Sequence, residues 1–457
     1  MLGGVIIRNE LTPEEILRKA RALMPGIVQD LKSLLGYPSV AFPGYPSGPV
    51  NAMADATVVM LKRYGLQDAR LVDIPGGYPA VYGEIPAPPG APTVLMYAHY
   101  DVQPAKREDG WDTDPWVPVE KGGRIYGRGA ADDKSGIAII AASLGIFEGK
   151  PPVGVKVLIE GEEETTGHLE EFVAAHPALF QCDAFIIIDN GSLSVGNPAL
   201  TTTLRGEVSC LIEVQTLDHA VHSGSFGGAA PDALVCLIRI LATLHDPRGD
   251  VAVPGLRRDT GGNMEYPEEI YRASAGVLDG VDLIGTGPLS SRLWSKPSVT
   301  VIGIDAPSIS AASNSLIPRA AAKISMRISP GADARRELHL LMDYLRSATP
   351  WNAHLEVSEV NDSSGFICPA DGPGFIAARR ALETAFGKPV RKIGAGGTIS
   401  LLRVLHNAVP NAEFILWGAE DASCSRIHGA NESVDISELE RIIVAQSLFC
   451  EILGQGG

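Results

Sequence analysis

The sequence predicts an α/β fold in which a mixed, mostly parallel sheet is covered by helices. Four near-continuous apolar runs carry this prediction, at 93–98, 155–159, 184–188 and 414–417. Strands that are apolar on both faces belong inside a sheet that helices cover on both sides. Segments 135–147 and 435–453 fit two of these helices. Thr12 and Pro13 fit the N-cap and first position of an earlier helix.

The middle of the chain has a different pattern. It predicts six elements in the order β-α-β-β-α-β. Their ranges are 208–216, 231–244, 298–302, 320–328, 332–347 and 354–360. This order is typical of a small α+β sandwich with its helices on one face. We therefore expect an inserted domain at 206–361, within a first domain formed by 1–205 and 362–457. Segment 257–287, polar and glycine-rich, is expected to be a long excursion within the insert.

The composition narrows the classes of protein to consider. At 457 residues the chain is too long for one ordinary core, and no apolar run approaches the roughly 18 residues that a membrane span needs. The net charge of −16 argues against nucleic acid and anionic membrane as partners. Six cysteines without a C-x-x-C pair predict buried, reduced thiols. The first ten residues lack the pattern of a secretory signal, so we expect a cytoplasmic protein.

Five short motifs of acidic residues and histidine lie at strand ends or in the loops that follow them. They are Y-A-H-Y-D with His99 and Asp101, G-R-G-A-A-D-D-K with Asp132, E-G-E-E-E with Glu163 and Glu164, I-I-I-D-N with Asp189, and I-H-G-A-N-E with His428. Ligand sites of open parallel sheets collect at the carboxyl ends of the strands. Two histidines and several carboxylates suit a pair of zinc-like divalent ions, and a spare glutamate supplies a base.

Each motif also has a plainer interpretation. Asp101 follows His99 by two residues on an extended segment and can orient its imidazole, although a loop histidine beside a solvated aspartate has the same spacing. Asp132 can bind a metal while Asp133 caps the next helix, and capping alone also explains the pair. One glutamate of the E-E-E run can be a ligand and its neighbour a general base, whereas such runs are commonly solvated surface.

The five motifs together resemble those of the dinuclear zinc amidohydrolases, which include carnosinase-type dipeptidases, aminoacylase, glutamate carboxypeptidase and succinyl-diaminopimelate desuccinylase. The resemblance spans about residues 15–452, with the motifs in family order. It implies a zinc-peptidase-like catalytic domain split by an inserted dimerisation or lid domain, and hence a homodimer. It also implies two divalent ions per subunit. Zn²⁺ is favoured, with Mn²⁺ and Co²⁺ as alternatives.

The resemblance also implies a role for each residue of the motifs. Asp132 would bridge the two ions, and the 132–133 peptide bond would be cis. The other ligands would be His99 with Asp189 on one ion and Glu164 with His428 on the other. Glu163 would be the general base, and Asp101 would support His99.

Two residues of the insert match the family's dipeptidase branch. His222, in D-H-A-V-H-S-G-S-F-G-G, would reach the site of a partner subunit and stabilise the oxyanion. A surface loop histidine is the alternative, and His219 is expected to be one. Arg327, in K-I-S-M-R-I-S-P-G, would bind the free carboxylate of the substrate through its guanidinium fork. The alternative for Arg327 is a surface ion pair at a strand edge.

Two segments depart from the sequence pattern of the dipeptidase branch. It usually reads R-E-G-G-S-I where this chain has G-A-G-G-T-I at 394–399. Gly396, Gly397 and Thr398 keep a substrate-binding loop and a hydroxyl, but the Arg-Glu pair is lost, which puts the shape of the pocket in question. A one-residue shift before Pro318 leaves Asn314 or Ser315 to face the substrate, and Asn314 is our prediction.

The sequence thus predicts metal-dependent hydrolysis of an amide bond next to a free carboxylate. The expected enzyme is a dipeptidase or short-peptide carboxypeptidase. One alternative is an N-acyl-amino-acid deacylase with the same residues. The other is a non-catalytic, metal-binding dimer, which predicts the loss of a ligand or of the base. Every expected ligand is present, and so is Glu163.

Overall fold

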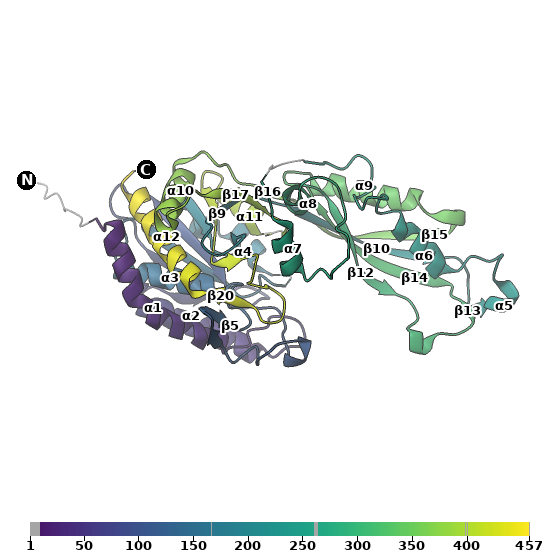
Figure 1. Ribbon diagram of the computed structural model, residues 1–457, viewed down its shortest axis with the longest axis horizontal. Coiled ribbons are helices and arrows are strands. Elements are labelled where there is room, and N and C mark those ends of the chain that lie inside the picture. Colours follow the sequence, from purple (N-terminus) through teal and green to yellow (C-terminus); the bar gives the residue numbers. More distant parts are fainter. Residues whose placement is uncertain (1–9, 166, 260–263, 398, 400, 457) are drawn as a thin grey trace, which may run out of the picture.

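The computed structural model of the chain describes residues 10–165, 167–259, 264–397, 399 and 401–456. The protein has two lobes that lie end to end along its long axis (Figure 1). Both termini lie in the first lobe, and the second lobe is built from the middle of the chain. Among the described residues, no helix combines the length and apolar character that crossing a membrane requires.

The first lobe is built on a nine-stranded mixed sheet with the strand order β1-β2-β6-β3-β7-β18-β9-β16, and β17 pairs with β9. The strands are β1 Arg70–Val72, β2 Ala80–Ile85, β3 Thr93–His99, β6 Gly154–Glu160, β7 Ala184–Ile187, β9 Ala199–Leu204, β16 Phe366–Ile367, β17 Arg391–Ala395 and β18 Glu413–Leu416. The central strands β6, β3, β7 and β18 run parallel. They coincide with the four apolar runs, so the predicted α/β class is confirmed.

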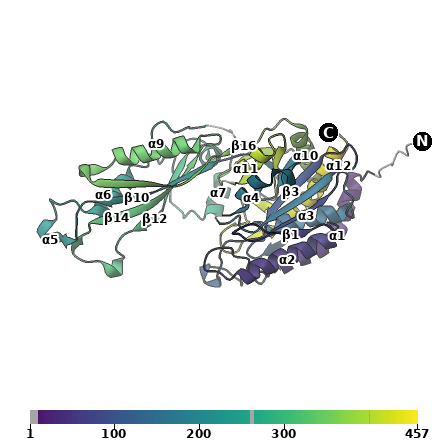
Figure 2. The same cartoon turned by 180° about the vertical axis from the view of Figure 1, so that it is seen from behind.

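Helices cover both faces of this sheet. Alternate residues of β3 enter two different cores: Val94, Met96 and Ala98 enter one, and Leu95 and Tyr97 enter the other. The first core is covered by α1 Pro13–Leu35, α2 Ser47–Arg63, α3 Lys134–Ile146, α10 Pro373–Phe386 and α12 Ile436–Gly454, and the second by α4 Leu169–Ala175 and α11 Leu401–Ala408. Figure 2 shows α1 and α2 along the same edge of the lobe.

Short strands complete the first lobe near its strand ends. One small sheet joins β4 Val119–Lys121, β5 Arg124–Tyr126 and β20 Ser433–Asp435. Another pairs β8 Gly191–Ser192 with β19 Glu420–Asp421. These pairings bring the loop before β20 close to the segments that follow β7.

The second lobe is a four-stranded antiparallel sheet of order β12-β14-β10-β15 with its own hydrophobic core. Its elements are β10 Gly206–Gln215, α6 Ala233–Ala242, β12 Ser298–Asp305, β14 Arg319–Ile328, α9 Ala334–Ser347 and β15 His354–Ser363. This is the predicted β-α-β-β-α-β order. At the tip, β11 Val221–His222 pairs with β13 Ser315–Leu316, and α5 Ser223–Phe226 follows β11. We propose 206–361 as an inserted domain on this basis.

The long excursion of the insert returns to the first lobe. It contains α7 Glu268–Ala275, and α8 Leu289–Trp294 follows it. Both helices lie between the two lobes in Figure 1. Trp294 packs against Leu193, Ala199 and Ile393 of the first lobe in a small separate core. Met264 and Tyr266 of the excursion pack against the same core, which the weak periodicity of the segment did not indicate.

The six cysteines are all free. Four of them are buried, as predicted, and Cys182 is half-buried. Cys424 is exposed, so the prediction of a buried thiol is wrong there. The reason is its position in the loop after β19, because loops run over the surface.

Candidate metal centre

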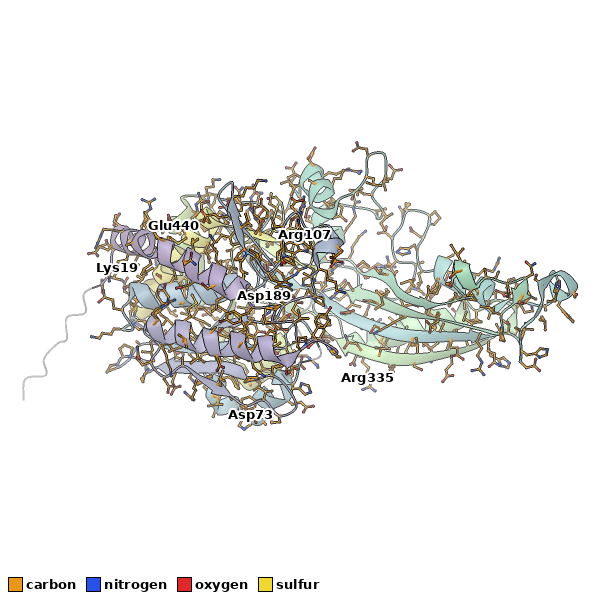
Figure 3. The ribbon with its side chains drawn as sticks, turned by 90° about the horizontal axis from the view of Figure 1, so that it is seen from below. Lys19, Asp73, Arg107, Asp189, Arg335 and Glu440 are labelled. Atoms are coloured by element: carbon orange, nitrogen blue, oxygen red, sulfur yellow. The ribbon has the colours of Figure 1, made fainter. Side chains whose placement is uncertain are left out.

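Three neighbouring parallel strands bring the predicted acidic and histidine residues together. His99 ends β3, the glutamates at 163 and 164 follow β6, and Asp189 follows β7. Since β6, β3 and β7 are adjacent and parallel, their carboxyl ends meet at one edge of the sheet. Asp132 joins them from the loop before α3, and His428 from the loop between β19 and β20. Figure 3 labels Asp189 within the first lobe.

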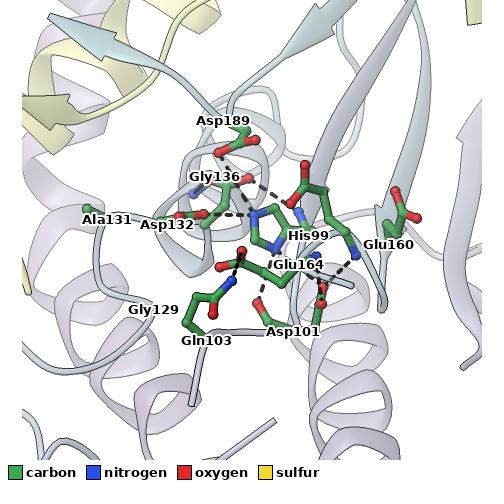
Figure 4. Close-up of polar contacts among 12 residues, drawn as sticks. His99, Asp101, Gln103, Gly129, Ala131, Asp132, Gly136, Glu160, Glu164 and Asp189 are labelled. Atoms are coloured by element: carbon green, nitrogen blue, oxygen red, sulfur yellow. Dashed lines mark hydrogen bonds and ion pairs between the residues drawn. The ribbon is translucent and has the colours of Figure 1, made fainter. Parts of the chain in front are cut away.

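The carboxylate of Asp132 lies between two sets of side chains. Its Oδ1 atom is 2.9 Å from Nε2 of His99, and that nitrogen is 3.9 Å from Oδ1 of Asp189 (Figure 4). Its Oδ2 atom is 3.0 Å from Nε2 of His428, which is 3.2 Å from Oε2 of Glu164. The two oxygens of one carboxylate thus face two separate groups of donors.

The described residues contain three groups of metal donors whose ligand atoms lie within 4.8 Å of one another. They are His99 with Glu163 and Asp189, Asp132 with Glu164 and His428, and Asp132 with Asp189 and Glu420. Imidazole nitrogens combined with carboxylate oxygens suit Zn²⁺, Mn²⁺ and Co²⁺. Two of the groups share Asp132, which fits a pair of ions.

The electrostatics of the cluster also favour cations. Burial and the nearby charge of Asp132 together raise the pKa of Asp189 to about 7. Burial also raises the pKa of Glu163 well above its usual range; His99 opposes this shift, and Asp189 adds to it. Carboxylates this close together repel unless a positive charge compensates them. Divalent cations would therefore stabilise the ionised cluster.

The backbone sets the proton position on His99. Its Nδ1 atom lies 3.1 Å from the carbonyl oxygen of Asp101 and 3.4 Å from Oδ1 of the same residue. A carbonyl oxygen can only accept, so we assign a proton to Nδ1. Nε2 faces the Asp132 carboxylate and is the nitrogen that a metal would bind in place of a second proton. The expected contact between Asp101 and the imidazole is present, but the closer partner is the carbonyl.

The carboxylate of Asp101 has a second contact that sequence reasoning missed. Its Oδ1 accepts the backbone N–H of Glu163 at 3.1 Å, and its Oδ2 accepts that of Glu164 at 3.0 Å. The spacing of Asp101 from His99 reports only on its own strand. It cannot reveal a contact with a loop that lies 62 residues further along.

The loop that carries Asp132 is held by two buried carboxylates. Asp133 caps α3 by accepting the N–H of Gly136 at 3.1 Å, as expected, and the Asp132–Asp133 peptide bond is cis, as the resemblance implies. Glu432 accepts the N–H groups of Ala131 and Asp132 through Oε1 and also pairs with Arg128 at 2.6 Å. Sequence reasoning missed Glu432, although it ends the motif that contains His428.

A pocket of about 410 Å³ adjoins the metal centre. It includes Glu420, another carboxylate that sequence reasoning missed, and Gly396 of the altered loop. The carbonyl of Gly396 accepts a hydrogen bond from Nε of Arg205 at 3.4 Å. Gly397 is also described, whereas Thr398 lies outside the described residues.

The residues expected from the insert lie apart from this centre within one chain. His222 and Asn314 are neighbours at the tip of the second lobe, where Ser223 N donates to the carbonyl of Asn314 at 2.9 Å. Figure 1 shows this tip, marked by α5 and β13, at the end of the molecule far from the first lobe. Arg327 lies near the inner end of β14, with Nη1 3.3 Å from Oε2 of Glu207.

An α/β sheet with two donor groups sharing one carboxylate fits the two-metal type of site that metallohydrolases use. Residues 95–451 match the sequence model of peptidase family M20/M25/M40. The chain therefore belongs to this family, and it is a metal-dependent hydrolase.

Dipeptidases are among its relatives. The chain is 37% identical to the cysteinylglycine-S-conjugate dipeptidase of Corynebacterium striatum, over 80% of this chain and 82% of that protein. It is 31% identical to the beta-Ala-His dipeptidase of Homo sapiens, over 81% of this chain and 76% of that protein.

Solved structures agree with the two-lobed fold. Human carnosine dipeptidase 1 matches 97% of this chain and 99% of its own, with a TM-score of 0.81 and 26% identity. A di-peptidase from Saccharomyces cerevisiae matches the same shares with a TM-score of 0.84. At 23% identity, this second likeness concerns the fold alone.

Proposed function

We propose that the protein is a dipeptidase that hydrolyses the amide bond next to the substrate's free carboxylate with two bound divalent cations. The observation that carries this proposal is the arrangement of two donor groups around Asp132, with Glu163 beside them. The relatives support it, because their names give cysteinylglycine S-conjugates and beta-Ala-His as their substrates. We propose Zn²⁺ as the metal, with Mn²⁺ and Co²⁺ as alternatives.

Each ion would have its own pair of ligands, and Glu163 would be the base. One ion would be held by His99 and Asp189 and the other by Glu164 and His428, with Asp132 between them. When bound, two divalent cations lower the pKa of a water molecule and polarise the scissile carbonyl. The carboxylate of Glu163 accepts the proton of the attacking water and returns it to the leaving amine. Asp101 holds the backbone of Glu163 in place for this transfer.

The substrate's carboxylate is assigned to Arg327 and the loop of Gly396, Gly397 and Thr398. The planar guanidinium can bind both carboxylate oxygens, and loop N–H groups can complete the site. The position of Arg327 near the inner end of β14 supports this role. The alternative, a purely structural ion pair, has support from its contact with Glu207.

We further propose a homodimer formed through the second lobe. The edge strand β12 leaves Ile302 53% and Ile304 51% exposed, and α6 leaves Val235 and Ile238 about half exposed. Exposed apolar residues on an edge strand favour association with another chain. A dimer would let His222 and Asn314 reach the site of the partner, where His222 would donate to the developing oxyanion. A cytoplasmic location completes the proposal, and the six free cysteines support it.

Hydrolysis of a mixed panel by the metal-loaded protein tests this function. The panel pairs free dipeptides with N-acetyl amino acids that have the same C-terminal residue. We expect faster cleavage of the dipeptides. Preference for the acetyl compounds would make the protein a deacylase. If the metal-loaded protein hydrolysed neither kind of compound, the non-catalytic dimer would be favoured.

A further inference from the structure

The pocket beside the metal centre has an apolar wall that comes from the inserted segment. Tyr266 precedes α7, Tyr271 lies on α7, and Leu293 and Trp294 lie on α8. Tyr266 and Trp294 also contact each other, with ring centroids 5.7 Å apart. Aromatic surface of this kind binds large apolar groups. The wall belongs to the excursion and to α8 that follows it, and none of the assigned catalytic steps uses either.

The lining of the pocket also includes an acidic residue that meets the metal centre. Glu420 lines the pocket, and one of its oxygens lies within 4.8 Å of ligand atoms of Asp132 and Asp189. A carboxylate at this place attracts an ammonium group and repels a second carboxylate. The amino end of a dipeptide therefore fits here better than its carboxyl end.

The small residues of the altered loop keep the pocket open. Gly394 and Ala395 line it, and a Cβ atom at Gly394 would lie 2.6 Å from the Cβ of Trp294. The bare backbone of Gly394 thus lets Trp294 approach the sheet, and Ala395 adds only a methyl group. The volume of about 410 Å³ lies within the roughly 300–1,000 Å³ of ligand pockets.

We propose that this pocket binds the N-terminal residue of the dipeptide, with a large apolar side chain against Tyr271 and Trp294 and the α-ammonium at Glu420. The inference rests on the proposed dipeptidase function and adds a substrate class, dipeptides that begin with an aromatic or another large apolar residue. Glu420 and the apolar wall together would select both the free amine and the bulk of the side chain.

Filling the pocket from α7 tests the side-chain assignment. Ala275 lines the pocket, whereas Ala273 is an exposed residue of the same helix outside the lining. Ala275→Trp is expected to lower kcat/KM for Phe-Gly by about tenfold or more, because KM rises. The kcat/KM for Ala-Gly should stay within about twofold of the wild-type value. Ala273→Trp is the matched control and should change neither value.

The ratio of kcat/KM for Phe-Gly to kcat/KM for N-acetyl-Phe-Gly tests the role of Glu420 without depending on overall activity. The wild-type protein should prefer Phe-Gly to N-acetyl-Phe-Gly, and Glu420→Gln should reduce this preference while the content of bound Zn²⁺ stays unchanged. An unchanged preference would overturn the ammonium assignment, as would loss of the metal.

Two outcomes overturn the side-chain assignment while the dipeptidase function stands. One is an Ala275→Trp protein with unchanged kcat/KM for Phe-Gly. The other is a fall in kcat/KM for Gly-Phe alone, which would mean that the pocket binds the C-terminal residue. If the wild-type protein cleaves neither Ala-Gly nor Phe-Gly, the proposed function itself fails, and the pocket assignment fails with it.

Discussion

The carboxylate of Asp101 accepts the backbone N–H of Glu163 at 3.1 Å. Its other oxygen accepts the next N–H along the chain, at 3.0 Å. The end of β3 and the loop after β6 are therefore fixed to each other at the metal centre. Because the carbonyl of Asp101 also faces Nδ1 of His99, one residue orients both a proposed ligand and the proposed base.

Asp101→Asn should weaken this connection. An amide has one acceptor oxygen where the carboxylate has two, so one of the two loop N–H groups loses its partner. We expect kcat or metal affinity to fall about 10–100-fold, as for other residues that orient metal ligands. Steady-state kinetics and metal analysis check this. The control is Asp73→Asn at the exposed surface of the same lobe (Figure 3). Full kcat with full metal content would contradict the role.

Glu163→Gln distinguishes a base from a ligand. Glu163 belongs to a donor group with His99 and Asp189, so its position alone permits either role. A lost general base is expected to lower kcat by about 10²–10⁴-fold and to leave two ions per chain. Loss of one ion would make Glu163 a ligand instead. Glu162→Gln is the matched control from the same run of glutamates, because its Oε2 faces Nδ1 of His168 at 3.0 Å.

The parts of the site that the sequence predicts are those with a local signal. His99 and Asp189 directly follow apolar strands, and parallel neighbouring strands bring such residues together. Glu432 has no such signal for its contact, because it accepts N–H groups 300 residues earlier in the chain. Trp294 is similar, since its polar, glycine-rich surroundings do not indicate packing on Ile393 of the other lobe. Contacts of this kind depend on topology, which hydrophobic periodicity does not encode.

Glu160 should make the stability of the protein depend on pH. Burial raises the pKa of Glu160 from 4.5 to about 8, although the hydroxyl of Tyr97 donates to its Oε2 at 2.6 Å. Between these two values the folded state binds more protons than the unfolded state, so the free energy of unfolding falls as the pH rises. A tenfold change in proton affinity corresponds to about 1.4 kcal/mol.

Glu160→Gln removes this titration and keeps an acceptor for Tyr97. The variant should therefore gain stability relative to the wild-type protein as the pH rises from about 5 to about 9. Urea unfolding of both metal-free proteins across this range measures the difference, in which the titration of the other groups cancels. A difference that does not change with pH would contradict the buried, protonated state of Glu160.

His222→Ala tests whether the second lobe completes the site of a partner. Within one chain His222 belongs to β11, which pairs with β13 at the tip of that lobe, far from the first lobe (Figure 1), so its proposed role requires another subunit. His222→Ala and Glu163→Gln should each be nearly inactive. Co-expressed, they should recover about a quarter of wild-type activity, because half of random dimers are mixed and each mixed dimer has one complete site.

The control for this recovery is His219→Ala, which changes an exposed histidine near the same tip and should keep full activity alone. Size-exclusion chromatography of the co-expressed pair shows whether mixed dimers form. Mixed dimers without recovered activity would contradict the action of His222 across the interface, since each would still hold one intact Glu163 opposite one intact His222. Full activity of His222→Ala alone would remove the oxyanion role altogether.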